Sequence, residues 1–282
     1  MRIAVFGAGG KMGCRTIDNL RKTSWELLPV EIGATGVANL RARGLEPVPA
    51  KEALAADAVI LAVPDRALGS VAREVVPALR QGTLVITLDP AAAHAGELPS
   101  RRDVAYFVTH PCHPPLFGDE TDPEARKDFF GGIRARQAIV CALMQGSEAD
   151  YARGEEIART MFAPVTRAHR ITVEQMAILE PAMAETVTAC CCTVIRESLD
   201  EAVRRGVPPD AARDFMMGHV QIPLAIVFGQ IGSSFSDGAK LIIEHGKRYL
   251  FRPDWKKVFE PESIREQVQA IVRGTPPPPP SA

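Results

Sequence analysis

Two histidines flanked by prolines form the stretch of this chain whose residue types most clearly suggest chemistry. Residues 108–115 read Val-Thr-His-Pro-Cys-His-Pro-Pro, which places His110 and His113 directly after a predicted strand. Neutral imidazoles bind zinc and other borderline cations well, and the prolines restrict the backbone that carries them. The stretch predicts a divalent-metal site that uses one or both of these histidines. The alternative is that one histidine forms a local hydrogen bond and the other binds substrate.

A carboxylate from elsewhere in the chain must complete such a site, and Glu180 is the best candidate. It lies in an apolar helical segment beside Pro181, which interrupts or kinks a helix. A charge in so apolar a segment requires a partner, because an unpaired buried charge is costly. Glu185, five residues further, does not share a face with Glu180 on a regular helix. It is expected at the surface, or as a proton-transferring group if the kink brings it back.

The first half of the chain alternates short apolar runs with helical patterns, and these elements must position the histidines. This alternation predicts a Rossmann-type, doubly wound parallel sheet with helices on both faces. A loop or lid is expected over residues 117–135. The predicted strands are Ile3–Phe6, Leu27–Glu31, Ala58–Val63, Thr83–Leu88, Val104–Val108 and Gln137–Leu143, and the predicted helices are Met12–Arg21, Val37–Arg43, Ala67–Leu79 and Glu148–Phe162.

A glycine-rich turn follows the first predicted strand and opens the first predicted helix. This arrangement lets the backbone approach a pyrophosphate at the start of the helix, so the sequence predicts a dinucleotide site. Glu31 ends the second strand, where a carboxylate accepts hydrogen bonds from ribose and repels a 2′-phosphate, which favours NAD over NADP. Pro64 is expected to line the cofactor crevice, and Asp65 either does so too or caps the next helix. The residues of the turn expected to bind cofactor are Gly7, Gly9, Gly10, Lys11 and Met12.

The second half of the chain is predicted to be entirely helical. Thr172 to Gln175 has the form of a capping box and begins a long helix that should end near Arg205, before Gly206. Further helices are expected at Pro209–His219, Pro223–Ile231 and Ser236–Glu244. The predicted domains are therefore an NAD-binding domain at 1–165, a helical substrate and dimerisation domain at 166–274, and a disordered proline-rich tail at 275–282.

Composition narrows the class of protein further. With 282 residues, 46% hydrophobic content and a formal net charge of −1, the chain gives no electrostatic reason to bind nucleic acid or an anionic membrane. Charges break its apolar runs, so no segment is expected to span a bilayer. The six cysteines form no disulfide framework, and residues 190–192 are expected to be small buried residues. A cytoplasmic location is the prediction.

The glycine loop, Glu31 and the helical second half resemble the 6-phosphogluconate and beta-hydroxyacid dehydrogenase superfamily. Those enzymes carry a catalytic lysine on the first long helix after the nucleotide domain, whereas this chain has no lysine between Lys127 and Lys240. The histidine stretch, residues 117–120 and the Glu180 segment are similar to a subgroup that bears a phosphogluconate dehydrogenase-like C-terminal domain. A metal held by His113 as principal ligand and by Glu180, with His110 assisting, would then replace the missing lysine.

The resemblance implies an NAD-dependent oxidoreductase that oxidises a hydroxyl of a small, branched sugar acid and shifts its carbon skeleton, working as a homodimer. One alternative is a simple or decarboxylating dehydrogenase acting on a beta-hydroxyacid or semialdehyde. A second, of a different class, is a non-catalytic protein that senses NAD. The metal would bind the substrate carboxylate and hydroxyl, and Glu185 or a histidine would move the proton.

Overall fold

The computed structural model describes residues 1–277, and the chain divides into two compact units. The first comprises Met1–Glu180 together with the segment from Ile264 onward, and the second comprises Pro181–Ser263. Most of the proline run predicted as a disordered tail lies outside the described residues. Each unit is described by itself below.

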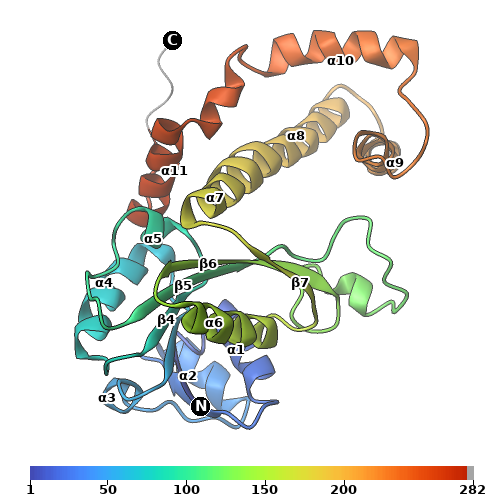
Figure 1. Ribbon diagram of the computed structural model, residues 1–282. Coiled ribbons are helices and arrows are strands. Elements are labelled where there is room, and N and C mark those ends of the chain that lie inside the picture. Colours follow the sequence, from blue (N-terminus) through green and yellow to red (C-terminus); the bar gives the residue numbers. More distant parts are fainter. Residues whose placement is uncertain (278–282) are drawn as a thin grey trace. The chain divides into compact units, whose positions relative to one another are not determined.

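A mixed sheet forms the framework of the first unit (Figure 1), with the strand order β2-β1-β3-β4-β5-β6-β7. The first five strands are parallel, β6 runs antiparallel to β5, and β7 is parallel to β6. The predicted doubly wound parallel sheet is therefore confirmed. The strands are β1 (Arg2–Phe6), β2 (Glu26–Val30), β3 (Ala58–Leu61), β4 (Leu84–Thr87), β5 (Ala105–Pro111), β6 (Gln137–Gln145) and β7 (Val165–Arg170).

Helices cover both faces of this sheet and bury its central strands. Ile60 and Phe107 face a core shared with α1, α2 and α6, whereas Leu61 and Val108 face a core shared with α3, α4, α5 and α7. Burial on both faces explains why the central strands are continuously apolar. The helices are α1 (Lys11–Leu20), α2 (Ala34–Arg41), α3 (Ala50–Ala53), α4 (Asp65–Val75), α5 (Ala91–His94), α6 (Glu148–Met161), α7 (Val173–Ala177) and α11 (Pro261–Arg273), with single 3₁₀ turns at Val76–Ala78 and Ala125–Lys127.

Strand β5 is longer than the apolar pattern predicts. The predicted strand ended at Val108, but antiparallel pairing with β6 carries β5 on to Pro111, with His110 opposite Val140. His110 is therefore a strand residue with a fixed orientation, whereas His113 lies in the loop beyond the strand.

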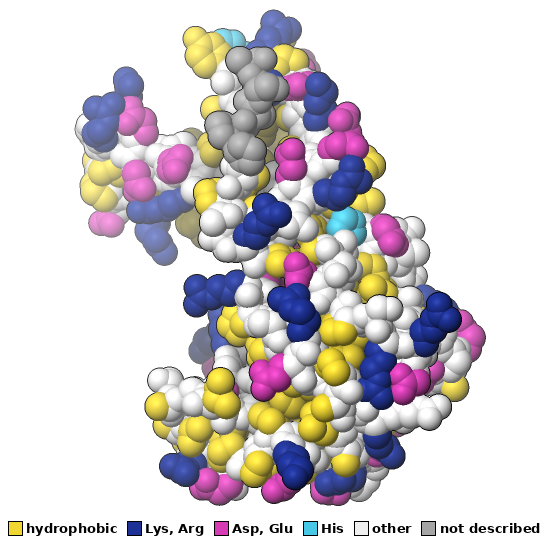
Figure 2. Space-filling model, turned by 90° about the vertical axis from the view of Figure 1, so that its left-hand side faces the viewer, with side chains coloured by type: hydrophobic (Ala, Val, Ile, Leu, Met, Phe, Trp, Pro, Cys, Tyr) yellow, Lys and Arg dark blue, Asp and Glu magenta, His cyan; other side chains and the backbone are white. Residues whose placement is uncertain are grey.

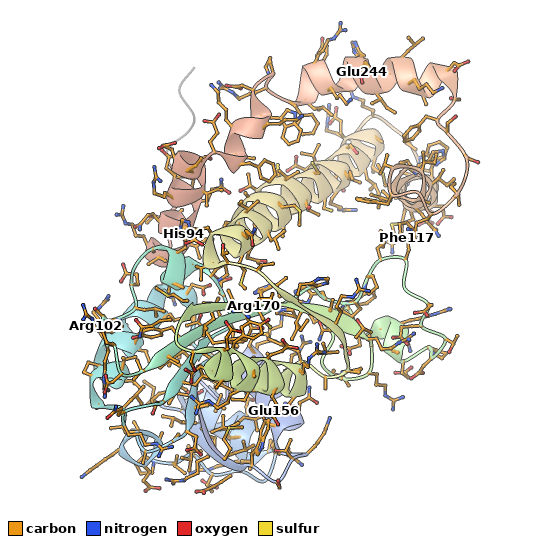
Figure 3. All side chains as sticks on the ribbon, viewed as in Figure 1. His94, Arg102, Phe117, Glu156, Arg170 and Glu244 are labelled. Atoms are coloured by element: carbon orange, nitrogen blue, oxygen red, sulfur yellow. The ribbon has the colours of Figure 1, made fainter. Side chains whose placement is uncertain are left out.

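Strand β7 was not predicted, and it moves the boundary of the first unit. The expected boundary between residues 165 and 166 falls where β7 begins, because this strand pairs with β6. Arg170, which is labelled in Figure 3, ends this strand. It binds both carboxylate oxygens of Glu148 at 2.6 Å and lies over the ring of Tyr151. These contacts attach residues 165–170 to α6 and explain why the first unit continues to Glu180.

The predicted capping box and long helix are both confirmed. The Thr172 hydroxyl accepts the Gln175 N–H, the Gln175 side chain accepts the Thr172 N–H, and α7 begins there. The expected interruption at Pro181 takes the form of a π-helical stretch, Ile178–Ala189, since a wider helix accommodates the missing N–H.

The second unit contains α8 (Cys190–Arg204), α9 (Pro209–Val227), α10 (Asp237–Leu250) and a 3₁₀ turn at Trp255–Phe259. The prediction of two helices within 209–231 was wrong, because α9 continues through Pro223 and ends before Gly229, whose φ is +65°. The prediction of buried cysteines at 190–192 was also wrong, because Cys190 and Cys192 are exposed on α8 within this unit.

By length and composition alone, one helical stretch of the described chain, Val173–Arg204, could cross a membrane. This differs from the expectation that charges interrupt every apolar run, because the helix continues through Pro181 and joins segments that look separate in the sequence. A single stretch of this kind does not identify a membrane protein, since core helices of soluble proteins have the same length and composition.

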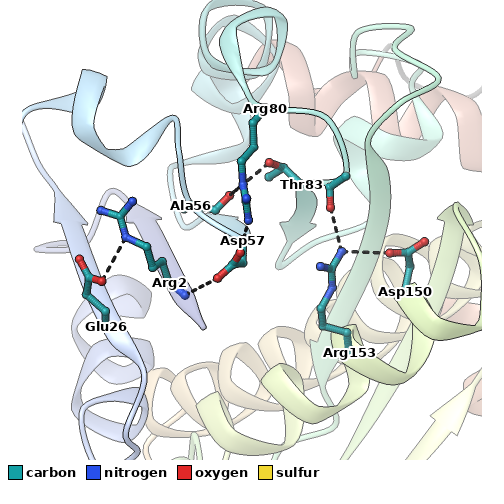
Figure 4. Close-up of polar contacts among 9 residues, drawn as sticks. Arg2, Glu26, Ala56, Asp57, Arg80, Thr83, Asp150 and Arg153 are labelled. Carbon is teal, nitrogen blue, oxygen red and sulfur yellow. Dashed lines mark hydrogen bonds and ion pairs between the residues drawn. The ribbon is translucent and has the colours of Figure 1, made fainter.

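A polar cluster lies at the amino ends of the neighbouring strands β1 and β3 (Figure 4). Asp57 accepts the backbone N–H of Arg2 at 2.6 Å and pairs with the guanidinium of Arg80, which also donates to the carbonyl of Ala56. The Arg2 N–H, followed by the charge of Arg80, lowers the pKa of Asp57. The cluster therefore joins the starts of two strands to the segment that precedes β4.

Replacing Asp57 by alanine should lower the free energy of unfolding by about 2 kcal/mol, because hydrogen bonds to charged groups contribute about 1.5–3 kcal/mol each. The loss should shrink in acid, since a carboxylate with a lowered pKa stabilises the fold above its ordinary pKa and stops doing so as the pH falls through the lowered value. Thermal unfolding of the variant and the parent at several pH values measures both effects.

Glu26→Ala is the matched control, because it breaks only the exposed pair between Glu26 and the Arg2 side chain. Such surface pairs contribute about 0–1 kcal/mol. Equal losses in the two variants would contradict the role given to Asp57.

Candidate active site

The glycine loop lies where the strand order reverses, between β1 and β3, which is where doubly wound sheets bind nucleotides. Gly7 has a φ of +74°, and a Cβ at Gly9 would collide with the backbone of Gly36. The first hydrogen bond of α1 runs from the Cys14 N–H to the Gly10 carbonyl, so the preceding helical N–H groups have no acceptor within the helix. The loop therefore has the geometry predicted for binding a pyrophosphate.

Glu31 lies beside this loop, just beyond the end of β2. Its Oε2 accepts the Gly9 N–H at 3.0 Å, and its Oε1 accepts the N–H groups of Ile32 and Gly33 at 2.9 and 2.8 Å. A carboxylate offers about four acceptor positions, so these bonds fix the side chain and leave Oε2 able to accept a ribose hydroxyl.

A cavity of about 440 Å³ adjoins the start of α1 and the carboxyl ends of β3, β4 and β5. Pro64 and Asp65 both line it, as predicted for the cofactor crevice. Pro64 is the N-cap residue of α4, and Asp65 is the first residue and the acidic side chain of its first turn. The other polar or aromatic lining residues are Lys11, Asp89, His110, His113, Phe130 and Glu180.

Three side chains converge at the edge of this cavity. His110 Nε2 lies 3.3 Å from Glu180 Oε2, and ligand atoms of Asp89, His110 and Glu180 all lie within 4.8 Å of one another. His110 Nδ1 is 2.9 Å from the Leu88 carbonyl, which can only accept, so Nδ1 carries the proton. In its neutral form the ring would direct the lone pair of Nε2 at the carboxylates, as a metal-ligating histidine does.

The electrostatics of this cluster favour a cation. Burial, followed by the negative charge of Asp65, raises the pKa of Asp89 to about 7, although the Ala91 N–H donates to its carboxylate. Burial also raises the pKa of Asp65, and the charge of Glu180 adds to this effect. Carboxylates gathered in a place of low polarity are stable when a divalent ion neutralises them, so the donor set fits a divalent metal.

His113 was expected to be the principal metal ligand, but the structure places it outside the cluster of ligand atoms. Its Nδ1 is 3.0 Å from the Phe130 carbonyl, and its backbone has a φ of +62°. The centre of its ring lies 6.0 Å from that of His110, and it is not one of the three residues whose ligand atoms cluster. It lines the same cavity and can therefore meet a substrate there.

Asp89 is the cluster residue that was not predicted as a ligand. Its signal in the sequence was its position directly after a strand, on the same edge as the histidines. Glu185 belongs to the second unit, so its proton-transfer role stays a prediction.

Together, the reversal in strand order, the glycine loop and the acidic cluster define a dinucleotide-binding protein with a candidate metal centre beside the cofactor crevice. Residues 118–272 match the model of the phosphogluconate dehydrogenase (decarboxylating) C-terminal domain. D-apionate oxidoisomerases from Rhizobium rhizogenes and Cupriavidus necator are 53% and 51% identical, and the matches cover 95% and 96% of this chain and 98% and 99% of theirs. The chain therefore belongs to the family of D-apionate oxidoisomerases that carry this C-terminal domain.

A solved structure agrees with this assignment. The semialdehyde dehydrogenase NAD-binding protein from Cupriavidus necator, in complex with calcium and NAD, matches with a TM-score of 0.93 and 51% identity, covering 96% of this chain and 99% of that chain. Its whole-chain similarity confirms the predicted combination of a Rossmann-type domain with a helical C-terminal part.

Replacing His110 with alanine should weaken binding of Mn²⁺ or Zn²⁺ by at least about tenfold, as removing the side chains that hold a metal typically does. Isothermal titration with each ion measures this directly, without any need for turnover. His169→Ala is the control, because His169 is exposed on β7 and outside the cluster. Equal affinity of wild type and His110→Ala would remove His110 from the metal site.

Proposed function

We propose that this protein is an NAD-dependent oxidoreductase that oxidises a hydroxyl of a branched sugar acid and isomerises its carbon skeleton, as its D-apionate oxidoisomerase relatives are named for doing. The observation that carries the proposal is the Asp89–His110–Glu180 cluster at the edge of a cavity that also adjoins the glycine loop. The relatives match nearly the whole chain, so the similarity includes both units.

NAD fits the residues of the cofactor crevice. Lys11, Met12 and Gly13 can offer free helix N–H groups to its phosphates, and Glu31 can accept a ribose hydroxyl while its charge repels a 2′-phosphate. When bound, NAD supplies the acceptor for the hydride. The relative solved with NAD supports this choice of cofactor.

Asp89, His110 and Glu180 would hold the divalent metal, with His113 at the border of the same space. An imidazole with carboxylates suits zinc or manganese, and the solved relative contains calcium. When bound, such an ion supplies a Lewis acid that lowers the pKa of a substrate hydroxyl and polarises a ketone.

His113 is the best-placed group to move the proton. The Phe130 carbonyl can only accept, so His113 Nδ1 carries a proton, and in the neutral ring Nε2 bears the lone pair. That nitrogen can accept the proton of a substrate hydroxyl as the bond between carbon and hydrogen breaks. His113 therefore changes from the expected principal metal ligand to the proposed general base, whereas His110 takes the ligand role.

We also propose that the protein is a homodimer formed through its second unit. Helices α9 and α10 expose large apolar side chains within that unit, and α8 exposes cysteines. A water-soluble chain rarely leaves so many apolar side chains exposed unless another surface covers them. The most exposed of them are Phe215, Met217, Val227, Leu241, Ile242, Tyr249 and Leu250, and Phe228 directly after α9 is also exposed.

The cytoplasm is the proposed location, because all six cysteines are free, as is usual in a reducing compartment. The face drawn in Figure 2 mixes basic and acidic side chains. This mixture agrees with the near-zero net charge and with a small-molecule substrate rather than nucleic acid.

Incubation of the purified protein with D-apionate and NAD should form NADH, and thorough chelation should abolish the reaction until Mn²⁺ or Zn²⁺ is restored. NADH absorbance and product analysis measure both. Turnover that survives metal removal would contradict the metal role, and release of carbon dioxide would favour a decarboxylating dehydrogenase. NAD binding without turnover on any sugar acid would favour the sensor.

His113→Ala should lower kcat by about 100-fold or more, since general acid–base catalysis contributes about 10²- to 10⁴-fold. NAD affinity should change little, because the variant leaves the glycine loop and Glu31 intact. Steady-state kinetics and NADH fluorescence titration measure the two effects. A normal rate would remove His113 from the catalytic role.

A further inference from the structure

We propose that Phe130 is a positioning residue, an inference that rests on the proposed function. Its ring contacts His113 and also the two cations beside the proposed phosphate site, Lys11 and Arg15. No catalytic contact is assigned to Phe130 itself. Its ring contacts both groups at once, so a single side chain orients the proton-moving residue and the phosphate end of the cavity.

The loop that carries Phe130 is held firmly. Oδ2 of the buried Asp128 accepts the backbone N–H groups of Ile133, Arg134 and Ala135 at 3.0, 2.9 and 3.2 Å. This fixes the turn that follows Phe130, although its ring is 48% exposed. A half-exposed aromatic ring on a rigid turn is suited to orienting its neighbours. Its removal also costs little core packing, so a variant at this position should still fold.

Two cations meet the ring of Phe130. Lys11 Nζ lies 4.1 Å and Arg15 Cζ 4.7 Å from its centre. The two cations are one helical turn apart in α1, where like charges repel, and within residues 1–277 neither forms an ion pair with an acid. The π face of Phe130 stabilises them, and it does so beside the glycine loop, where the phosphates of NAD are proposed to bind.

The same residue holds His113. The Phe130 carbonyl accepts the Nδ1 proton of His113, and the two rings meet edge to face with their centres 5.9 Å apart. The φ of +62° at His113 is a conformation that a side chain-bearing residue adopts only when its surroundings impose it. Phe130 provides two of the contacts that impose it.

It follows that the ring of Phe130 holds the side chains of Lys11 and Arg15 in position to bind the cofactor phosphates. The same ring keeps His113 directed into the cavity. Phe130→Ala should raise the Kd for NADH about 5- to 30-fold, the effect of losing two cation–π contacts of about 0.5–1 kcal/mol each. The same variant should lower kcat about tenfold, because a misplaced catalytic group loses rate steeply.

The experiment compares four variants by NADH fluorescence titration and steady-state kinetics. Phe130→Leu keeps the apolar volume but removes the π face, so its Kd for NADH should rise as in Phe130→Ala. Phe130→Tyr keeps the face and should behave as wild type. Phe129→Ala is the matched control, because Phe129 is the adjacent ring, is 78% exposed and has no ring contact within residues 1–277.

Lys11→Met completes a double-mutant cycle with Phe130→Ala. If the ring acts through Lys11, the second substitution should weaken NADH binding much less in the Phe130→Ala background than alone. Simple addition of the two effects, or unchanged Kd and kcat in Phe130→Ala, would overturn the inference. A wild-type protein that binds no NADH would instead overturn the proposed function, and the inference with it.

Discussion

The crowding of Asp65, Asp89 and Glu180 around one imidazole is the constraint on which the rest of the site depends. Burial raises the pKa of both aspartates, the charge of Glu180 adds to both increases, and the charge of Asp65 adds to that of Asp89. Lys11 is the only permanent cation that lines the described cavity. The arrangement is therefore stable as a charged site when it contains a positive ion, which explains why a metal and this carboxylate set belong together.

The architecture of the sheet creates this crowding from residues that lie far apart in the sequence. Parallel strands β3, β4 and β5 are neighbours, so Asp65, Asp89 and His110 reach the same edge. Glu180 lies there because β7 and α7 keep the chain within the first unit, up to Glu180, before the second unit begins. The helical stretch that follows β7 contains no lysine and delivers a carboxylate to this edge, and a bound ion would supply the neutralising positive charge.

The two histidines stand in different backbone environments, which is the reason for the different roles proposed for them. His110 is held within β5 and directs Nε2 at the carboxylates, whereas His113 stands in a constrained loop next to Phe130. Prolines near both residues made them look equivalent in the sequence. The difference arises from the antiparallel pairing of β6, which extends β5 through His110 but not through His113.

The sequence by itself determined the strand, glycine turn and helix of the cofactor crevice, the position of Glu31, the capping box at Thr172 and the helical nature of the second half. These features depend on neighbours within a few residues. Only the tertiary structure decided that Asp89 joins the cluster, that His110 rather than His113 faces Glu180, and that Phe130 lies against Lys11, Arg15 and His113. Those relations depend on which strands are neighbours and on where their pairing ends. Neither is encoded locally by the residue types along the chain.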